Sequence, residues 1–516
     1  MSDTPAWVAD AVFYQIFPDR FAASARVPKP GPLEPWDAAP TYNGYKGGDL
    51  LGIVEHLDHL SELGITALYL TPVFASASNH RYHTYDYYQV DPLLGGNAAL
   101  RELLDASHAR GMRVVLDGVF NHSGRGFWPF HHVVENGIGS PYVDWFHVDK
   151  AALAAGKELR PYPSREDGKR MAELAAAGTH QGDVSLKALG YRAWWDLPAL
   201  PKLNTDNPGM REHLMGVAEH WLKFGIDGWR LDVAEEIDAG YWREFRMRCR
   251  QINPDAYIVA EIWREKPQWV SGDTFDGLMN YPLTEALLSF TGGRHLDAAV
   301  VQTQHEYRDT VSPIDGPAFA GRLAHLMTMY RPEAIRAQLN LLGSHDTARY
   351  LTLVSRDSAA LRLALLAIAT LPGAPCIYYG DEVGMQGRHD PDNRRAFPWD
   401  HATWDHELLE YCRAVIALRH QRPDLRHGEF KMLAANEHAV AYGRLGTSSG
   451  ALVLLNAGAA PCRLTVPIDA FGGASLQPIK LASEPFPVFI GSESGRLEVE
   501  VAARSGAVLL AGESGA

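Results

Sequence analysis

The hydrophobic pattern of this chain alternates between two periods over its first four-fifths. Short, nearly continuous apolar runs predict strands that are buried on both faces. Between them lie segments with apolar residues at helical spacing, and two of these segments end at Gly64 and Gly225, as helices commonly do. Strands and helices in alternation are typical of βα units around a parallel sheet. The runs begin at Ala11, Ala67, Arg113, Ile226, Ala256, Asp276, Ala337 and Ala374.

Eight such runs predict a closed (β/α)₈ TIM barrel, and the pattern departs from it in two places. Between Phe120 and Ile226 the chain is far longer than one βα unit needs, which predicts a small domain inserted after the third strand. After residue 425, period-two runs with Gly and Ser turns predict a C-terminal antiparallel β-sandwich. The expected division is 1–122 and 201–425 for the barrel, 123–200 for the inserted domain and 426–516 for the sandwich.

The charge and cysteine content of the chain indicate which kinds of partner and which cellular location to expect. The 516-residue chain has 48 basic and 62 acidic side chains, a formal charge of −14 and no basic run, which favours a neutral substrate over nucleic acid or an anionic membrane. Its N-terminus lacks the pattern of a secretion signal, and no apolar stretch has the length of a membrane span. We therefore expect a cytoplasmic protein whose four scattered cysteines are buried thiols.

Charged and imidazole side chains follow several of the predicted strands. In the stretch GIDGWRLDVAEEI, strand alternation points Arg230 and Asp232 to the same face. A guanidinium so close favours the ionised carboxylate, so Asp232 is expected to stay charged although it is buried. Barrel active sites lie at the C-terminal ends of strands, so groups at those ends are expected to share one rim. The other strand-end residues are Asp117, Asn121, His122, Glu261, His345 and Asp346.

Carboxylates with cations and imidazoles nearby suit two chemistries: metal-assisted hydrolysis and cleavage of a glycosidic bond by a carboxylate pair. The first favours closely spaced histidines, and here the histidines are isolated apart from His131 and His132. The second needs one ionised carboxylate and another held protonated, roughly 5 Å apart in retaining enzymes. Glu261 has no basic neighbour in its own strand, so an apolar setting that raises its pKa is expected. A metal-dependent hydrolase and a non-catalytic binding barrel remain as alternatives.

Four of the strand-end stretches resemble the sequence motifs of the α-amylase family, in order and at fitting distances. A fifth stretch, LPKLN at 200–204, is similar to the variant found in neopullulanases, cyclomaltodextrinases and maltogenic amylases. The resemblance covers essentially the whole chain. It implies a retaining hydrolase of α-1,4 and also α-1,6 bonds in maltooligosaccharides, cyclodextrins or pullulan, with an α-glucan transglycosylase that uses the same residues as the alternative. The four motifs are DGVFNH (117–122), GWRLDVAEE (228–236), AEIW (260–263) and GSHDTAR (343–349).

The resemblance also implies a role for each motif residue. Asp232 would be the nucleophile, Glu261 the acid and then the base, and Asp346 the third carboxylate, which grips hydroxyls of the sugar being cleaved. Arg230 would orient Asp232, and His122 with His345 would bind hydroxyls of the same sugar. The remaining residues expected to contact or support substrate are Tyr82, Asp86, Lys202, Glu235, Glu236, Trp263 and Arg349. Of these, Tyr82 would stack on the reacting sugar and Asp86 would support it.

The chain departs from the resembling subgroup in three respects. Such relatives usually carry an N-terminal β-domain that builds a dimer, whereas here the barrel starts near Ala11, so we expect a monomer or weak oligomer. Many also bind calcium, but the loop Ala22–Asp37 lacks the oxygen ligands, so we predict that this site is lost, that no cofactor is required and that Asp49 is a helix cap. Finally, Glu235 replaces an asparagine, and could shift the balance between water and sugar as acceptor.

Overall fold

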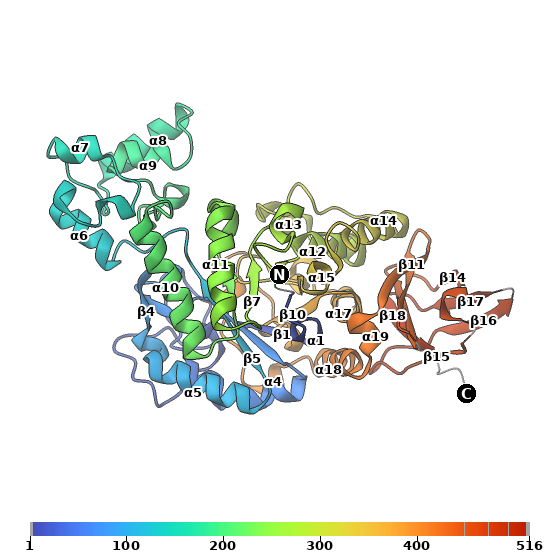
Figure 1. Ribbon diagram of the computed structural model, residues 1–516. Helices are drawn as coiled ribbons and strands as arrows, with labels where there is room; N and C mark the ends of the chain where they lie inside the picture. The colour runs from blue at the N-terminus through green and yellow to red at the C-terminus, as the bar shows by residue number, and fades with distance from the viewer. Residues whose placement is uncertain (1–3, 448, 473, 494, 512–516) are drawn as a thin grey trace.

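The computed structural model describes residues 4–511 except 448, 473 and 494, and it contains the predicted barrel (Figure 1). Eight parallel strands form one sheet in the order β8-β7-β6-β5-β2-β1-β10-β9. A parallel bridge between Met279 and Leu339 links the two end strands. The fold class predicted for this part of the chain is therefore confirmed. The strands are β1 (Phe13–Ile16), β2 (Ala67–Leu70), β5 (Arg113–Gly118), β6 (Gly228–Leu231), β7 (Tyr257–Ala260), β8 (Gly277–Leu278), β9 (Leu339–Leu341) and β10 (Ala374–Tyr378).

The barrel strands are buried on both faces, which explains their continuous apolar runs. One face fills the barrel interior with side chains such as Phe13, Tyr69, Val115 and Val259, and the other face packs against the outer helices. Gly64 and Gly225 end their helices in the left-handed conformation, as the sequence predicts. The main outer helices are α3 (Leu50–Glu55), α4 (Leu57–Leu63), α5 (Gly96–Ala109), α10 (Pro208–Phe224), α11 (Ala239–Ile252), α12 (Tyr281–Leu287), α14 (Gly316–Leu326), α17 (Ser358–Thr370) and α18 (His406–Gln421).

The long segment after β5 forms a helical lobe that projects from one end of the barrel, shown in cyan in Figure 1. A small hairpin made of β3 (Phe74–Ser76) and β4 (Thr84–Val90) precedes it in the chain. Bridges from His122 to Lys202 and from Phe146 to Leu203 tie the two ends of this segment together. The boundary 123–200 stays a prediction. The helices of the lobe are α6 (Trp128–Asn136), α7 (Lys150–Ala154), α8 (Arg165–Ala176) and α9 (Asp183–Leu189).

The C-terminal part of the chain consists of two antiparallel sheets at the opposite end of the molecule, in red in Figure 1. Leu452, Leu464 and Val499 are among the apolar side chains of the core they share, so the predicted sandwich is confirmed. Residues 512–516 of the predicted domain lie outside the described residues. One sheet contains β11 (Glu429–Ala435), β12 (Ala439–Leu445), β13 (Gly450–Asn456), β18 (Ser505–Ala511) and β15 (Leu476–Pro478), and the other contains β14 (Cys462–Pro467), β17 (Arg496–Val501) and β16 (Val488–Glu493).

Two smaller predictions can be compared with the structure. Cys249, Cys376 and Cys412 are buried free thiols, as expected, whereas Cys462 is partly exposed. Cys462 is the first residue of β14 and lies on the same face of the strand as the buried Leu464 and Val466. Among the residues that the structure describes, no helix has both the length and the apolar character that crossing a bilayer requires.

Candidate active site

Arg230 is the centre of a charged cluster at the C-terminal ends of the barrel strands. Its Nη1 lies 2.9 Å from Oδ1 of Asp232 and 3.0 Å from both carboxylate oxygens of Asp117. Its Nη2 lies 3.1 Å from Oε2 of Glu261. Three strands, β5, β6 and β7, thus bring their carboxylates to one guanidinium, and all four side chains are nearly or fully buried. The sequence prediction that strand ends would converge here agrees with this geometry.

The residue after Asp232 has a strained backbone conformation, in which it donates a hydrogen bond to Glu261. Val233 has φ 39° and ψ 48°, a left-handed conformation that is rare for a β-branched residue. In this conformation its N–H donates to Oε2 of Glu261 at 2.9 Å. Trp263 donates from Nε1 to Oε1 of the same carboxylate at 3.1 Å. Strained residues of this kind cluster at functional sites, where the surrounding structure holds them in place.

The surroundings of Asp232 and Glu261 differ from those that the sequence predicts. The expected apolar setting of Glu261 is wrong, because Arg230 reaches it from the neighbouring strand. Burial and the adjacent charge of Glu261 raise the pKa of the Asp232 carboxyl well above its usual range, against the opposing effect of Arg230. Arg230 therefore opposes two effects that disfavour the charged form of Asp232. Three carboxylates thus lie around a single cation.

Asp117, the third carboxylate around Arg230, also accepts hydrogen bonds from two tyrosines. Tyr69 and Tyr82 donate their hydroxyls to its Oδ2 at 2.8 and 2.9 Å. Burial raises the pKa of Asp117 to about 6, although Arg230 and the two tyrosine hydroxyls lower it. Like Asp232, this group is held in a position that disfavours its charge.

Both predicted histidines are buried and neutral. Burial is the main cause that lowers the pKa of His122 to about 3 and that of His345 well below its usual range. Nδ1 of His345 lies 2.8 Å from Nε2 of Gln15, and its Nε2 lies 2.6 Å from the Tyr82 hydroxyl. Nε2 of His122 has no hydrogen-bond partner among the described residues. A neutral imidazole with a free nitrogen is suited to bind a sugar hydroxyl.

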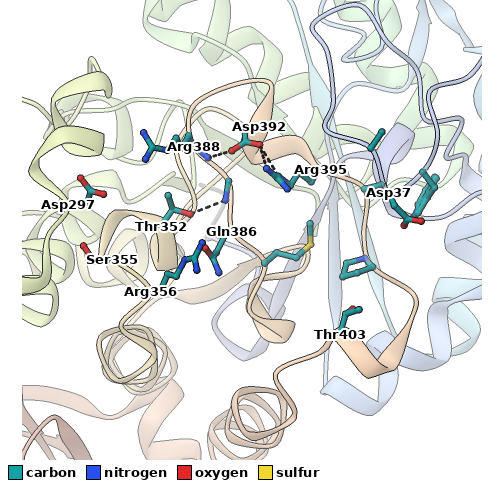
Figure 2. Close-up of a pocket in the computed structure, with 16 residues that line it drawn as sticks. Asp37, Asp297, Thr352, Ser355, Arg356, Gln386, Arg388, Asp392, Arg395 and Thr403 are labelled. Carbon is teal, nitrogen blue, oxygen red and sulfur yellow. Dashed lines mark hydrogen bonds and ion pairs between the residues drawn. The ribbon is translucent and has the colours of Figure 1, made fainter.

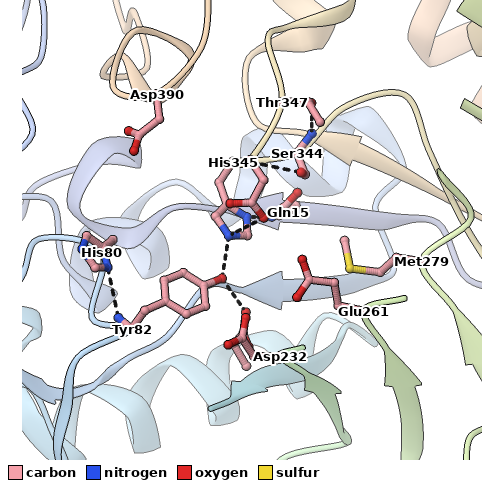
Figure 3. Close-up of polar contacts among 12 residues, drawn as sticks. Gln15, His80, Tyr82, Asp232, Glu261, Met279, Ser344, His345, Thr347 and Asp390 are labelled. Atoms are coloured by element: carbon pink, nitrogen blue, oxygen red, sulfur yellow. Dashed lines mark hydrogen bonds and ion pairs between the residues drawn. The ribbon is translucent and has the colours of Figure 1, made fainter. Parts of the chain in front are cut away.

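Tyr82 lies across the site from Glu261, with His345 and Asp232 between them (Figure 3). The ring of Tyr82 stacks on His345 with centroids 5.3 Å apart, so it lies within the site. Oδ2 of Asp346 lies 3.1 Å from Nε2 of His345, and the Asp346 side chain is one-third exposed. Asp346 is therefore the most open of the three predicted catalytic carboxylates and can contact a ligand that enters the site.

The other predicted contact residues divide between the rim and the interior. Lys202 and Glu236 form an ion pair of 2.7 Å at the rim, and Glu235 beside them is exposed. Trp263 contacts Glu261 and stacks on Tyr281 with centroids 3.6 Å apart, so it combines barrel packing with a place in the site.

Two predicted substrate residues are not brought to the site. Asp86 is exposed on β4, where irregular pairing with β3 turns it to solvent and its carboxylate accepts from the backbone N–H of Tyr88. Arg349 is fully buried and donates to Oδ1 of Asp381 at 2.8 Å and to the carbonyl oxygen of Tyr379. Arg349 thus anchors the loop after β10, and its place at the end of the motif GSHDTAR gives no information about these partners.

Several residues of the site have no signal in the sequence pattern. Gln15, Val233 and Tyr281 each contact a predicted site residue from another strand or turn. Arg394, from the loop after β10, approaches Asp346 at 3.5 Å and also pairs with Asp390 at 3.2 Å. The cluster DPDNRR at 390–395 has a charge density that could have drawn attention to this loop.

The position at which many relatives bind calcium contains a lysine in this chain. Asp49 caps α3 as expected, because its Oδ1 accepts from the N–H of Gly52 at 2.7 Å. Its Oδ2 accepts from the N–H of Ser24 and from the ammonium of Lys29 at 2.9 Å, and Lys29 also donates to the carbonyl oxygen of Leu93. Calcium needs six or more free oxygens, and these residues do not fit it. Elsewhere in the described part of the chain, no group of three or more His, Cys, Asp or Glu side chains has metal-binding geometry.

A cavity of about 680 Å³ lies on another side of the same loop (Figure 2). Arg388, Asp392 and Arg395 face this cavity, whereas Asp390 and Arg394 of the same loop lie near Asp346. None of the predicted site residues, all of which the structure describes, lines it. The cavity is thus distinct from the carboxylate cluster.

Fold and site together define a barrel hydrolase with a carboxylate pair, and comparisons with known proteins agree. The model of the family "Alpha amylase, catalytic domain" matches residues 15–427. A cyclomaltodextrinase from a Bacillus species is 42% identical over 456 residues, which cover 88% of this chain and 73% of the relative. The chain belongs to the α-amylase family of glycoside hydrolases.

Two further relatives extend the comparison. Neopullulanase 2 of Thermoactinomyces vulgaris is 39% identical over 443 residues, or 85% of this chain and 67% of that protein. The native structure of a debranching enzyme from Nostoc punctiforme superposes with a TM-score of 0.85 at 43% identity and covers 99% of both chains. The subgroup resemblance predicted from LPKLN is therefore confirmed.

Proposed function

We propose that this protein is a retaining α-glucan hydrolase that cleaves α-1,4 and also α-1,6 bonds of short or cyclic α-glucans. The observation that carries this proposal is the sharing of one guanidinium by Asp232 and Glu261, at 2.9 and 3.1 Å. Carboxylates held side by side leave little room for a water between them and the sugar, which is the arrangement of retaining enzymes. The names of the relatives, which include a cyclomaltodextrinase, a neopullulanase and a debranching enzyme, support the substrate class.

The proposed reaction has two displacements. Asp232 attacks the anomeric carbon while the bond to the leaving oxygen breaks, and Glu261, in its protonated form, gives that oxygen its proton. Glu261 then takes a proton from water, whose oxygen attacks the same carbon and releases Asp232. His122, His345 and Asp346 hold hydroxyls of the reacting sugar, and Tyr82 lies against its ring.

The proposal is tested by the products formed from concentrated maltotriose. Glucose and maltose are expected, with the α-anomer formed first in proton NMR, and Asp232→Asn should abolish both products. Products longer than maltotriose would mean that transfer to sugar competes with water. A β-anomer as first product, or full activity in Asp232→Asn, would contradict the double displacement.

The proposal extends to the setting of the enzyme. A monomeric or weakly oligomeric state and a cytoplasmic location stay predictions from the sequence. Sedimentation of the purified chain and fractionation of cells that express it are the direct measurements.

A further inference from the structure

Three stacked rings lead from the active site to the surface of the inserted lobe. The rings of His122 and Trp194 are 4.9 Å apart with an interplanar angle of 12°, and those of Trp194 and Trp195 are 5.0 Å apart at 22°. His122 is 1% exposed, whereas Trp195 is 53% exposed. Because Trp194 covers one face of the Trp195 indole, the exposed surface includes its other face.

Trp195 is held in this position at a cost to the backbone. It has φ 52° and ψ 25°, and Asp196 next to it has φ 56°, so two successive non-glycine residues are left-handed. The Asp196 carboxylate fixes the turn by accepting from the N–H groups of Gly182 and Ser185 at 2.9 and 2.7 Å. An exposed tryptophan in a strained turn contributes little to the core, so its presence calls for a functional reason.

The turn that carries Trp195 is attached directly to the strand end of His122. The N–H of Trp194 donates to the carbonyl oxygen of Leu200 at 2.9 Å, and that segment returns to form the bridge between Lys202 and His122. The N–H of Ser123 donates to the carbonyl oxygen of Pro201 at 3.1 Å. The position of the Trp195 ring is therefore set relative to the active site.

We propose that Trp195, supported by Trp194, is a stacking site for a glucosyl residue of the α-glucan chain, beyond the residue that His122 contacts. The apolar face of a glucose ring is flat, and a rigid indole offers it a large contact area at a small cost in side-chain entropy. The site rests on the proposed function, because it would bind the same glucan chain. It would favour chains long enough to span from the carboxylate pair to the lobe.

The test compares maltotriose with maltoheptaose in matched variants. Trp195→Gly removes the ring and suits the left-handed backbone, so its melting temperature should equal or exceed that of the wild type. It should lower kcat/KM for maltoheptaose about tenfold and leave that for maltotriose within about twofold. Trp195→Phe should recover most of the loss. Trp128→Ala is the control, because Trp128 is 63% exposed on α6 of the same lobe and lies outside the ring stack.

Binding in the Asp232→Asn background separates this site from the chemistry. Isothermal titration with maltoheptaose should show weaker binding when Trp195→Gly is added, and no change with maltotriose. Equal losses for both sugars, or none, in a wild type that cleaves both would overturn the stacking site alone. A wild type that cleaves neither sugar would overturn the proposed function and this site with it.

Discussion

The active site and the junction between barrel and sandwich both bury charged groups, but the groups that surround these charges differ. At the junction, Arg419 of α18 and Arg444 of β12 are fully buried and bind backbone carbonyls. Burial lowers the pKa of Arg419 to about 9 and that of Arg444 to about 10, so both stay charged at neutral pH. The carbonyl acceptors of Arg419 are those of Ala9, Ala369, Leu371, Gly373 and Leu425, and those of Arg444 are Thr370, Leu425 and Gly428.

In the active site, by contrast, several buried carboxylates share one cation. Asp117, Asp232 and Glu261 share Arg230, and the pKa of Asp232 is raised by burial and by the neighbouring carboxylate. A buried charge that stabilises the fold is surrounded by the ends of dipoles that carry the opposite partial charge. A buried charge in a reactive site lies close to charges of its own sign. The comparison therefore predicts that the two regions respond differently to loss of a charge.

The largest effect is expected for Asp232→Asn. The activity on maltotriose should fall on the order of 10⁴-fold, because the proposed nucleophile is lost. The free energy of unfolding should be unchanged or about 1 kcal/mol higher, because a like charge is removed from the cluster. Initial rates and chemical denaturation measure the two quantities. Asp309→Asn, on a side chain that is 81% exposed, should change neither. A loss of stability in Asp232→Asn would break the comparison.

At the junction the reverse is expected. Arg444→Met should lower the free energy of unfolding by about 3 kcal/mol, because three buried carbonyls lose their donor. The kcat/KM of the folded variant should stay within about twofold of the wild type. Urea denaturation gives the first value. Arg463→Met serves as control, since that side chain is 73% exposed on β14. A variant as stable as the wild type would show that the arginine carries no net stability.

The pH dependence of stability sharpens the comparison. Asp117 has a pKa of about 6 when folded against 3.8 as the usual value, so between these pH values the folded state binds more protons than the unfolded chain. This group therefore lowers stability as pH rises from about 4 to about 6, by about 3 kcal/mol in full. Asp117→Asn removes that slope, so thermal unfolding at pH 4 and pH 7 should show a gain relative to wild type that grows with pH. A difference independent of pH would refute the assignment.

A smaller effect is expected at Asp49. Lys29→Met removes the cation from a fully buried carboxylate and should lower the free energy of unfolding by about 1 to 2 kcal/mol. For the wild type, calcium or a chelator should change neither melting temperature nor activity, because the ammonium already occupies the carboxylate. Inactivation of the wild type by a chelator would revive the metal-dependent alternative.

The smallest effect is expected at the rim. Glu235 is exposed next to the Lys202–Glu236 pair, so Glu235→Asn should leave the melting temperature unchanged. If the added carboxylate binds acceptor hydroxyls, the ratio of transfer to hydrolysis with concentrated maltotriose should change by a few-fold. The ratio is read from the product profile. An unchanged ratio would remove Glu235 from the acceptor site.

The eight strands, and the convergence of the carboxylates that follow them, could be predicted from the sequence alone. Fully buried strands leave continuous apolar runs, and the parallel fold puts all their C-terminal ends at one rim, so Asp232, Glu261 and Asp346 were bound to converge. The closing glycines at Gly64 and Gly225 are local features of the same kind. Such features depend on neighbours within a few residues, which the sequence shows directly.

Only the tertiary structure decided the charge state and the partners of these groups. Arg230 reaches Glu261 from another strand, Arg349 turns inward to Asp381, and Asp86 faces solvent on an irregular hairpin. Lys29 reaches Asp49 across a loop. A pKa or an ion pair depends on which side chains come within about 4 Å, and here they come from distant parts of the chain. The physical reason is that folding brings the charged and hydrogen-bonding partners together from distant segments. The hydrophobic pattern of a strand depends only on how deeply that strand is buried.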